Sequence, residues 1–165
     1  MLPKLRKLLY ASDLGDNAAM VFAYAVALAR QHGAKIVFVH AMEPLSPTGR
    51  SLVRNIVPSD QLRQLEADGL ARVRQEIDER IDRFCTAELG ADPKAREIVS
   101  EIHIVEGHAA EVIVDQASQT GADLIVLGTH SRRGVQRALL GSVAHKVVSH
   151  TGRPVLLVPI PEDVK

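Results

Sequence analysis

The stretch Asp123–Val143, DLIVLGTHSRRGVQRALLGSV, decides the fold of this 165-residue chain. It begins with the short apolar run Asp123 to Leu127, which has the length and composition of a buried strand. A loop follows, and Ser142 to His150 then has helical periodicity. Glycines at positions 128, 134 and 141 are predicted to let the backbone turn sharply and approach a ligand without a side chain in the way. A buried strand, a glycine-rich loop and a helix in this order are typical of a parallel α/β sheet that binds ligands at its carboxyl edge.

Working outward from this stretch, similar apolar runs alternate with amphipathic segments along the whole chain. The predicted strands are Lys7–Ser12, Lys35–Ala41, Glu101–Val105, Asp123–Gly128 and Pro154–Pro159. The predicted helices are Asp16–His32, Ser59–Leu89, a segment after Gly107 and Ser142–His150. Because parallel strands are joined by right-handed crossovers that place helices on the sheet, we predict an α/β fold with both faces covered.

The least regular stretch is Pro44 to Pro58, where three prolines and a glycine interrupt any period. It predicts a mobile loop leading into the long helix. Such a loop is either an ordinary surface connection or a lid over a binding site.

The length and composition of the chain limit which classes of protein it can belong to. The length suits one domain, residues 1–165, and 46% hydrophobic with 24% charged residues is a globular composition. Twenty basic residues balance twenty acidic ones, which argues against a broadly basic nucleic-acid-binding protein. No apolar stretch reaches membrane-spanning length, and no secretory signal pattern is present. With the single cysteine, Cys85, read as part of a helix face, we expect a cytoplasmic protein.

Two places carry candidate binding residues, because helix N-termini at the carboxyl ends of strands present unpaired N–H groups. Ser142 either caps its helix or offers its hydroxyl to a phosphate. Asp13, after the first strand, either caps the next helix or accepts hydrogen bonds from a nucleoside. Asp16 is an equally good cap, which leaves Asp13 available for a ligand. Positive charge near the loop comes from three arginines, which otherwise form a solvated face: Arg132, Arg133 and Arg137.

Gly128, Gly141 and Ser142 resemble the signature of the universal stress protein family. In that signature a glycine, two residues, a second glycine, nine residues and then glycine with serine or threonine bind the phosphates and ribose of ATP. The similarity covers nearly the whole chain, through YASDLGDNAAMVFAYAVALA, VFVHAMEP and EGHAAEVIVDQASQTGADLIVLGTH. It implies a Rossmann-like five-stranded sheet in the order 3-2-1-4-5 and an ATP-binding protein with a regulatory or stress-response role.

The resemblance also implies the residues of the nucleotide site. Asp13 contacts the nucleoside, and the backbone of Ala41 meets the adenine edge. Ser131 stands where the family has its second glycine, at a cost on the order of 1–2 kcal/mol if that position needs a positive φ. The serine hydroxyl can also donate to a phosphate oxygen. The remaining predicted contacts are Gly128, His130, Arg132, Gly141, Ser142 and Val143.

Two functions remain open at this point. One is a nucleotide-responsive regulatory protein, with ATP, AMP or a cyclic nucleotide as ligand. The other is a nucleotide-independent interaction or scaffold protein whose ATP site has lapsed, an alternative motivated by Ser131. Phosphate-loop, nucleophile-elbow and dinucleotide-binding motifs are absent, so we expect binding rather than turnover, with weak ATPase activity as the third alternative.

The sequence also allows predictions about metal binding and about the oligomeric state. The seven histidines lack the spacing of a metal site, so we expect no dedicated metal ligands. Mg²⁺ would arrive with ATP, held mainly by phosphate oxygens and water. The resemblance implies a homodimer through the last strand, Pro154–Pro159, which is apolar and lies at the edge of the sheet.

Overall fold

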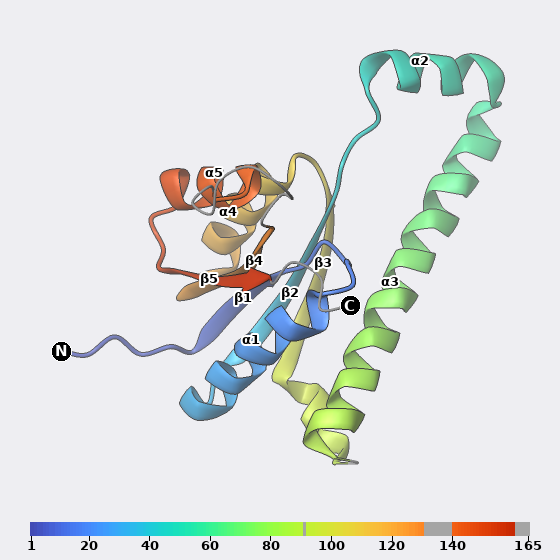
Figure 1. Cartoon of the computed structure of the whole chain (residues 1–165). Coiled ribbons are helices and arrows are strands. Elements are labelled where there is room, and N and C mark those ends of the chain that lie inside the picture. Colours follow the sequence, from blue (N-terminus) through green and yellow to red (C-terminus); the bar gives the residue numbers. More distant parts are fainter. Residues whose placement is uncertain (91, 131–139, 161–165) are drawn as a thin grey trace.

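The computed structural model describes residues 1–90, 92–130 and 140–160. These residues form a five-stranded parallel sheet in the order β3-β2-β1-β4-β5 (Figure 1). The predicted fold class and strand order are therefore confirmed. The strands are β1 (Lys7–Ala11), β2 (Lys35–Met42), β3 (Val99–Glu106), β4 (Leu124–His130) and β5 (Val155–Ile160).

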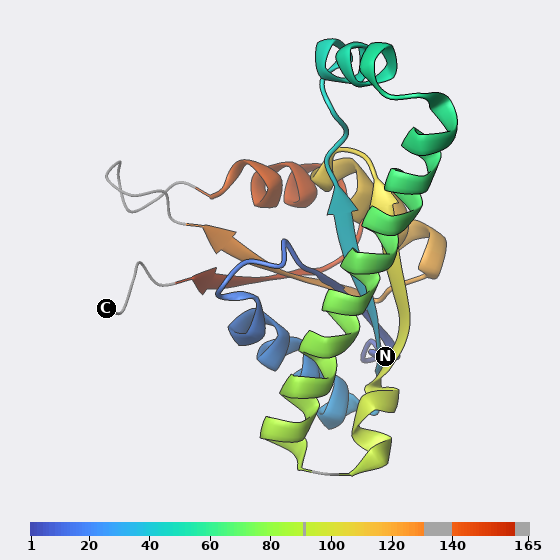
Figure 2. The same cartoon turned by 90° about the vertical axis from the view of Figure 1, so that its right-hand side faces the viewer.

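Helices cover both faces of the sheet (Figures 1 and 2). Buried residues of α1 and α3 form one core with the sheet, and buried residues of α4 and α5 form a second core on the other face. The helices are α1 (Ala18–His32), α2 (Pro47–Ile56), α3 (Ser59–Leu89), α4 (Ala109–Thr120) and α5 (Ser142–His150), with a short 3₁₀ helix at Pro93–Ile98. The predicted bounds of α3 and α5 coincide with the observed ones.

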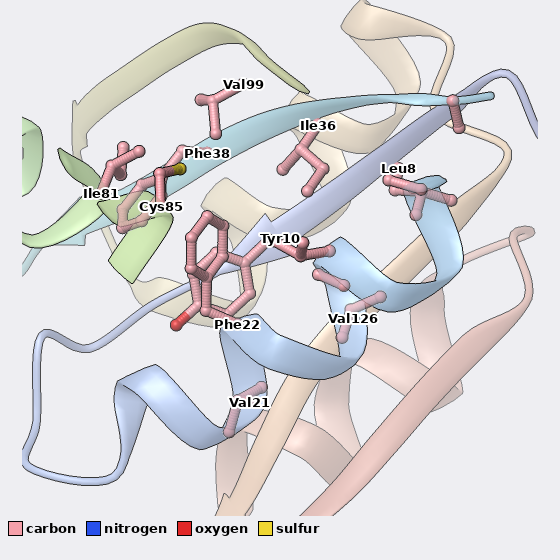
Figure 3. Close-up of a cluster of buried hydrophobic side chains, with 14 of the residues drawn as sticks. Leu8, Tyr10, Val21, Phe22, Ile36, Phe38, Ile81, Cys85, Val99 and Val126 are labelled. Carbon is pink, nitrogen blue, oxygen red and sulfur yellow. The ribbon is translucent and has the colours of Figure 1, made fainter. Parts of the chain in front are cut away.

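Successive residues of β1 enter opposite cores, because side chains alternate across a strand. Leu8 and Tyr10 pack with α1 and α3, whereas Leu9 packs with α4 and α5. Tyr10 lies against Phe22 and Phe38, with ring centroids 5.1 and 5.0 Å apart (Figure 3). Its hydroxyl donates to the carbonyl of Ala18 at 2.8 Å, and burial raises its pKa to about 12. The tyrosine thus joins the end of β1 to the start of α1.

The long helix α3 is buried only in its C-terminal half. Ile77, Ile81 and Cys85 are its buried residues, and they pack against β1, β2 and α1. Cys85 therefore belongs to a helix face, as predicted, and burial raises the pKa of its thiol. The first half of α3 extends past the carboxyl edge of the sheet (Figures 1 and 2).

The prediction of a loop over Pro44–Pro58 is wrong, because this stretch contains α2. The residues that suggested a loop here start a helix instead. Ser46 is the N-cap, and its hydroxyl accepts from the N–H of Gly49 at 3.1 Å. Pro47 occupies the first helical position, where its missing N–H and its restricted φ are both compatible with a helix.

Candidate functional site

The described members of the predicted site come together at the carboxyl edge of the sheet. β1 pairs with both β2 and β4. The helix after β1, α1, covers one face of the sheet, and the helix after β4, α5, covers the other. The chain therefore leaves this edge in opposite directions on either side of the β1–β4 pair, which is where open α/β sheets bind ligands. Asp13 follows β1, Ala41 lies near the end of β2, Gly128 lies in β4, and Gly141 precedes α5.

Several predicted site residues fall outside the described part of the chain. They are Ser131 and Arg132, together with Arg133, Gly134 and Arg137 of the same loop. The backbone of His130 ends β4, but its side chain is likewise outside the description.

Ser12 anchors the loop that follows β1. Its N–H donates to the carbonyl of Val39 at 3.0 Å, and its hydroxyl accepts from the N–H of Leu14 at 3.1 Å. Its carbonyl accepts from His40 Nδ1 at 2.8 Å, and since a carbonyl only accepts, this nitrogen carries the proton. Ser12 is itself buried. Three hydrogen bonds thus hold the backbone immediately before Asp13.

Asp13 is exposed, and its Oδ1 accepts from the N–H of Gly15 at 2.8 Å. Leu14, the next residue, has φ of 58°, in the left-handed region that costs a side chain about 1–2 kcal/mol. Its side chain packs against the α1 core, and Arg80 donates to the carbonyl of Gly15 at 3.3 Å. Packing and hydrogen bonding therefore maintain the strained turn that positions the Asp13 carboxylate.

The prediction that Asp16 is an equally good cap for α1 is wrong. The N-cap is Asn17, and its side chain makes no capping hydrogen bond. The strain at Leu14 was not predicted, because leucine carries no sequence signal for a left-handed conformation.

Ala41 turns its backbone toward the space beyond β1. In a parallel strand, alternate residues direct their peptide groups to opposite neighbours. The Val39 carbonyl accepts from Ser12 beside β1, and the Met42 carbonyl accepts from Gly107 beside β3. By this alternation the N–H and C=O of Ala41 point to the same side as those of Val39, toward β1. The pairing of β1 with β2 ends at Ala11, opposite Val39, so Ala41 lies beyond the last paired residue of β1. This orientation suits a backbone contact with a ligand.

Gly128 differs from its prediction as a turning point. It lies within β4, paired with Val158, and the strand continues to His130. A Cβ at this position would lie 2.7 Å from Ile160 Cδ1 and 3.0 Å from Val21 Cγ2. Close packing of β5 and α1 over the strand therefore requires glycine here, where the sequence had suggested a sharp turn.

The N-cap residue of α5 is a glycine, which has no side chain to bind the N–H groups of the first helical turn. The N-cap is Gly141, with φ of −55° and ψ of 150°, so Ser142 is the first helical residue. Of the two alternative roles predicted for Ser142, the N-cap is wrong and the phosphate contact stays a prediction. Ser142 and Val143 are both exposed. The N–H groups of a first helical turn have no partner within the helix and carry the positive end of its dipole. Exposed donors thus lie where the phosphates were predicted.

The N-terminus of α4 is occupied differently. The carboxylate of Glu43, which follows β2, accepts from the N–H of Ala109 at 3.1 Å and lies 3.1 Å from His108 Nδ1. The hydrogen bond from Ala109 and the neighbouring His108 lower the pKa of Glu43. An anion of the chain itself therefore already neutralises this helix end. Sequence reasoning missed Glu43, because its partner lies 66 residues away along the chain.

A cleft of about 550 Å³ lies between α1 and α3. Its lining includes Tyr10, Arg80 and Phe84, together with Ser12 and Asp16 at the two ends of the turn after β1. None of the described residues predicted for the nucleotide site lines it. We therefore assign the site from the convergence of strand ends and the α5 N-terminus, and treat the cleft as a separate feature.

Two further observations concern the described residues alone. No helix among them combines the length and the hydropathy needed to cross a membrane. They also hold no group of three or more histidine, cysteine or carboxylate side chains placed to bind a metal ion.

Comparisons with known proteins agree with this architecture. The model of the universal stress protein family matches residues 4–159. A universal stress protein of Thermus aquaticus is 33% identical over 153 residues, covering 93% of this chain and 98% of the relative.

Solved structures share the fold over nearly the whole chain. The universal stress protein UspA from Lactobacillus plantarum has a TM-score of 0.68 at 22% identity and covers 95% of this chain and 99% of its own. A universal stress protein crystallised in complex with cAMP has a TM-score of 0.63 at 22% identity, with 94% and 98% covered.

Proposed function

Because this chain belongs to the universal stress protein family, we propose that it binds an adenine nucleotide at the carboxyl edge of its sheet. In this proposal it is a cytoplasmic, single-domain protein over residues 1–165, and nucleotide binding serves a regulatory role in stress response. The observation that carries the proposal is the N-terminus of α5, where the N-cap residue is a glycine without a side chain, beside the β1–β4 switch point.

Each described part of the site has a role suited to such a ligand. The first-turn N–H groups at Ser142 and Val143 donate to phosphate oxygens, and the helix dipole favours their negative charge. The Asp13 carboxylate accepts hydrogen bonds from ribose hydroxyls or the adenine amino group. The peptide groups of Ala41 face the adenine edge. Mg²⁺ would be held mainly by the phosphates and water.

The loop between β4 and α5 completes the proposed site. We assign His130, Ser131 and Arg132 to it on the family signature, with the serine hydroxyl as a phosphate donor. The related universal stress protein crystallised with cAMP supports an adenine nucleotide as the ligand class. ATP is our first choice, and AMP or a cyclic nucleotide fits the same donors.

A nucleotide-independent scaffold role is the second candidate. Ser131, in place of the signature glycine, favours it, because a side chain at that position can obstruct the loop. In neither candidate do we assign a catalytic residue.

The deciding experiment is calorimetric titration of nucleotide-stripped protein with ATP and Mg²⁺, repeated with AMP and cAMP. Gly141→Asp should abolish binding, because it places a carboxylate beside the phosphate donors. Gly152→Asp is the matched control, since this exposed glycine lies beyond the other end of α5 with nothing within 4 Å. Micromolar binding that only Gly141→Asp removes supports the proposal. No heat at millimolar nucleotide favours the scaffold role.

We also propose a homodimer through β5, and the register follows from its free edge. The Pro154 carbonyl accepts from Ile125 of β4, so alternation turns the peptide groups of Val155, Leu157 and Pro159 outward. Proline has no N–H, which leaves two outward donors. If the β5 strands of two copies pair antiparallel about Leu156, Val155 of each copy lies opposite Leu157 of the other. The two outward N–H groups of each copy, four in the dimer, then all donate to carbonyl groups of the other copy.

An apolar groove beside this edge supports the same register. It is lined by residues of α1, including Tyr24 and Leu28, and by Leu156. Tyr24 is 54% exposed. The two Leu156 side chains would meet in this groove across the two-fold axis.

Light scattering tests the β5 pair. Leu156→Lys should give monomers, because two ammonium groups would face each other at the axis. Val148→Lys, the same kind of change at an exposed position of α5, should leave the dimer intact. A wild-type protein that stays monomeric at every concentration would refute this interface.

A further inference from the structure

The cleft between α1 and α3 gathers most of the aromatic side chains of the chain. The sequence has three phenylalanines, two tyrosines and no tryptophan. All three phenylalanines and Tyr10 line the cleft. Its volume of about 550 Å³ falls within the range of small-molecule sites, about 300–1,000 Å³, which are lined mostly by apolar and aromatic side chains. The cleft therefore has the size and the lining of a ligand site.

Four aromatic rings in mutual contact form the apolar floor of this cleft. Phe22 contacts Tyr10 and Phe84, with ring centroids 5.1 and 4.8 Å apart. Phe38 lies against Tyr10, with centroids 5.0 Å apart (Figure 3). Phe22 and Phe38 are buried, whereas Phe84 is only half-buried. The outer member of the cluster, Phe84, is therefore accessible to a ligand.

Small side chains leave this aromatic floor uncovered. Ala18 and Ala19 line the cleft from the first turn of α1, and Ala87 lines it from α3. Ala19 and Ala87 are both exposed. Because each of these positions carries only a methyl group, the two helices cannot fill the space between them from there.

The charged residues of the lining are mainly acidic. They are four carboxylates and two guanidinium groups: Asp16, Glu76, Glu79, Glu88, Arg80 and Arg83. Arg80 is already engaged, because it pairs with Glu76 at 2.7 Å and donates to the carbonyl of Gly15 at 3.3 Å. Within the part of the chain that the structure describes, the other three carboxylates and Arg83 form no ion pair. Three unpaired carboxylates thus outnumber one unpaired guanidinium group, and a cleft with an excess of one charge attracts ligands of the opposite charge.

We propose that this cleft binds a small organic cation, namely an amine carried on an aromatic or branched aliphatic body. The apolar body lies against Phe84 and the alanines, and the ammonium group lies toward the carboxylates of Asp16 and Glu88. Both partners favour a cation, because a ring face and a carboxylate each attract positive charge. The site goes beyond the proposed nucleotide function and does not depend on it.

Nuclear magnetic resonance titration with three matched probes tests the proposal. Phenethylamine, phenethyl alcohol and phenylpropionate carry the same phenylethyl body with a cationic, a neutral and an anionic group. Phenethylamine should bind about tenfold more tightly than the alcohol, with phenylpropionate the weakest. The amide signals that move should belong to α1 and α3 around the cleft. An amine that binds no more tightly than the other two probes, or not at all at millimolar concentration, would overturn the proposal.

A cleft-filling substitution tests the location of the bound amine. Ala87→Leu should abolish the binding of phenethylamine, because the larger side chain occupies the space beside Phe84. Thr86→Leu is the matched control, since this neighbouring exposed position of α3 does not line the cleft, and it should leave binding unchanged. Leucine has a high helix propensity, so both variants should fold, which circular dichroism checks. Equal binding by the two variants would place the amine elsewhere and refute the proposed site.

Removal of two carboxylates tests the recognition of charge. Asp16→Asn with Glu88→Gln should lower the affinity for phenethylamine toward that for the alcohol, while the affinity for the alcohol stays the same. Asp60→Asn with Glu66→Gln makes the same two changes at positions of α3 that do not line the cleft, and should alter neither affinity. The proposal fails if the Asp16–Glu88 variant keeps the full preference for the amine.

Discussion

At Gly128 the packing around β4 leaves too little room for a side chain. The nearest atoms to an added Cβ belong to Ile160 and Val21, which approach the strand from β5 and α1. One of them, Ile160 Cδ1, is the end of a flexible side chain and can move aside. The methyl group of Val21 is held in the core, where this residue is 3% exposed.

Gly128→Ala should therefore destabilise the protein by about 1–3 kcal/mol through overpacking. Urea denaturation measures the effect. Ile160→Val removes the closest methyl group, so the double variant should be more stable than the sum of the single changes predicts. Gly152→Ala, with nothing within 4 Å, should be nearly neutral. If both alanine variants behave alike, the packing explanation fails.

Asp123 joins the start of β1 to the turn before β4. Its Oδ2 accepts from the N–H groups of Arg6 and Lys7, at 2.8 and 3.0 Å. The hydrogen bond from Arg6 is the largest cause that lowers the pKa of this carboxyl group below its usual value of 3.8. The ionised form is therefore the one that stabilises the fold.

Asp123→Asn should destabilise the protein by about 1–2 kcal/mol at pH 7, because a neutral acceptor replaces a charged one. A group with a lowered folded-state pKa stabilises fully above its unfolded pKa, about 3.9, and loses this contribution as the pH falls through the folded value. The difference between wild type and variant should thus shrink below about pH 4. Denaturation at pH 7 and pH 3 checks this, and an unchanged difference would contradict it.

At the scale of elements, a local signal ends α3, and its two halves are stabilised in different ways. Its end is local, because Gly90 has φ of 73° and stops the helix at Leu89. Its stability comes from packing of the C-terminal half, while the first half is held mainly by helix propensity. Gly69 lies in that first half, and an added Cβ would meet nothing within 4 Å.

Gly69→Ala should raise the stability of α3 by up to about 1 kcal/mol, the difference in helix propensity between the two residues. Thermal unfolding followed by circular dichroism at low protein concentration measures the change. Gly90→Ala is the contrasting variant, because its left-handed φ makes any side chain unfavourable, and it should destabilise. A destabilising Gly69→Ala would mean that this side of α3 makes a close contact.

At the scale of the whole molecule, the sheet divides the interior into two cores. Ile77 of α3 belongs to one core and Ile125 of β4 to the other, and both are fully buried. Residues in separate clusters share no packing partners, so their substitutions should not influence each other. Because the strands contribute side chains to both cores, we expect the two cores to unfold together.

Ile77→Val and Ile125→Val should each cost about 0.5–1.5 kcal/mol through the methylene lost from the core. Their effects should add to within about 0.5 kcal/mol in the double variant, with one cooperative transition throughout. Chemical denaturation followed by far-ultraviolet circular dichroism gives both the free energies of unfolding and the number of transitions. Two separate transitions would show that the cores are independent units.

Much of the candidate site was predictable from strand order alone. Asp13 and Ala41 follow or end predicted strands, whose carboxyl ends a parallel sheet brings to one edge, and Gly141 precedes the predicted helix Ser142–His150. The roles of individual residues were less predictable. Gly128 was predicted to let the chain turn and instead lies in a strand under close packing, and of the two roles predicted for Ser142 the cap is wrong.

The sequence by itself determined the order and type of the strands and most helices, because hydrophobic periodicity and glycine stops are local properties of the chain. Only the tertiary structure decided that Glu43 occupies the N-terminus of α4. It alone decided that none of the residues of α2 is buried. The physical reason is distance: these features depend on contacts, or on missing contacts, between residues far apart in sequence, which no local pattern encodes.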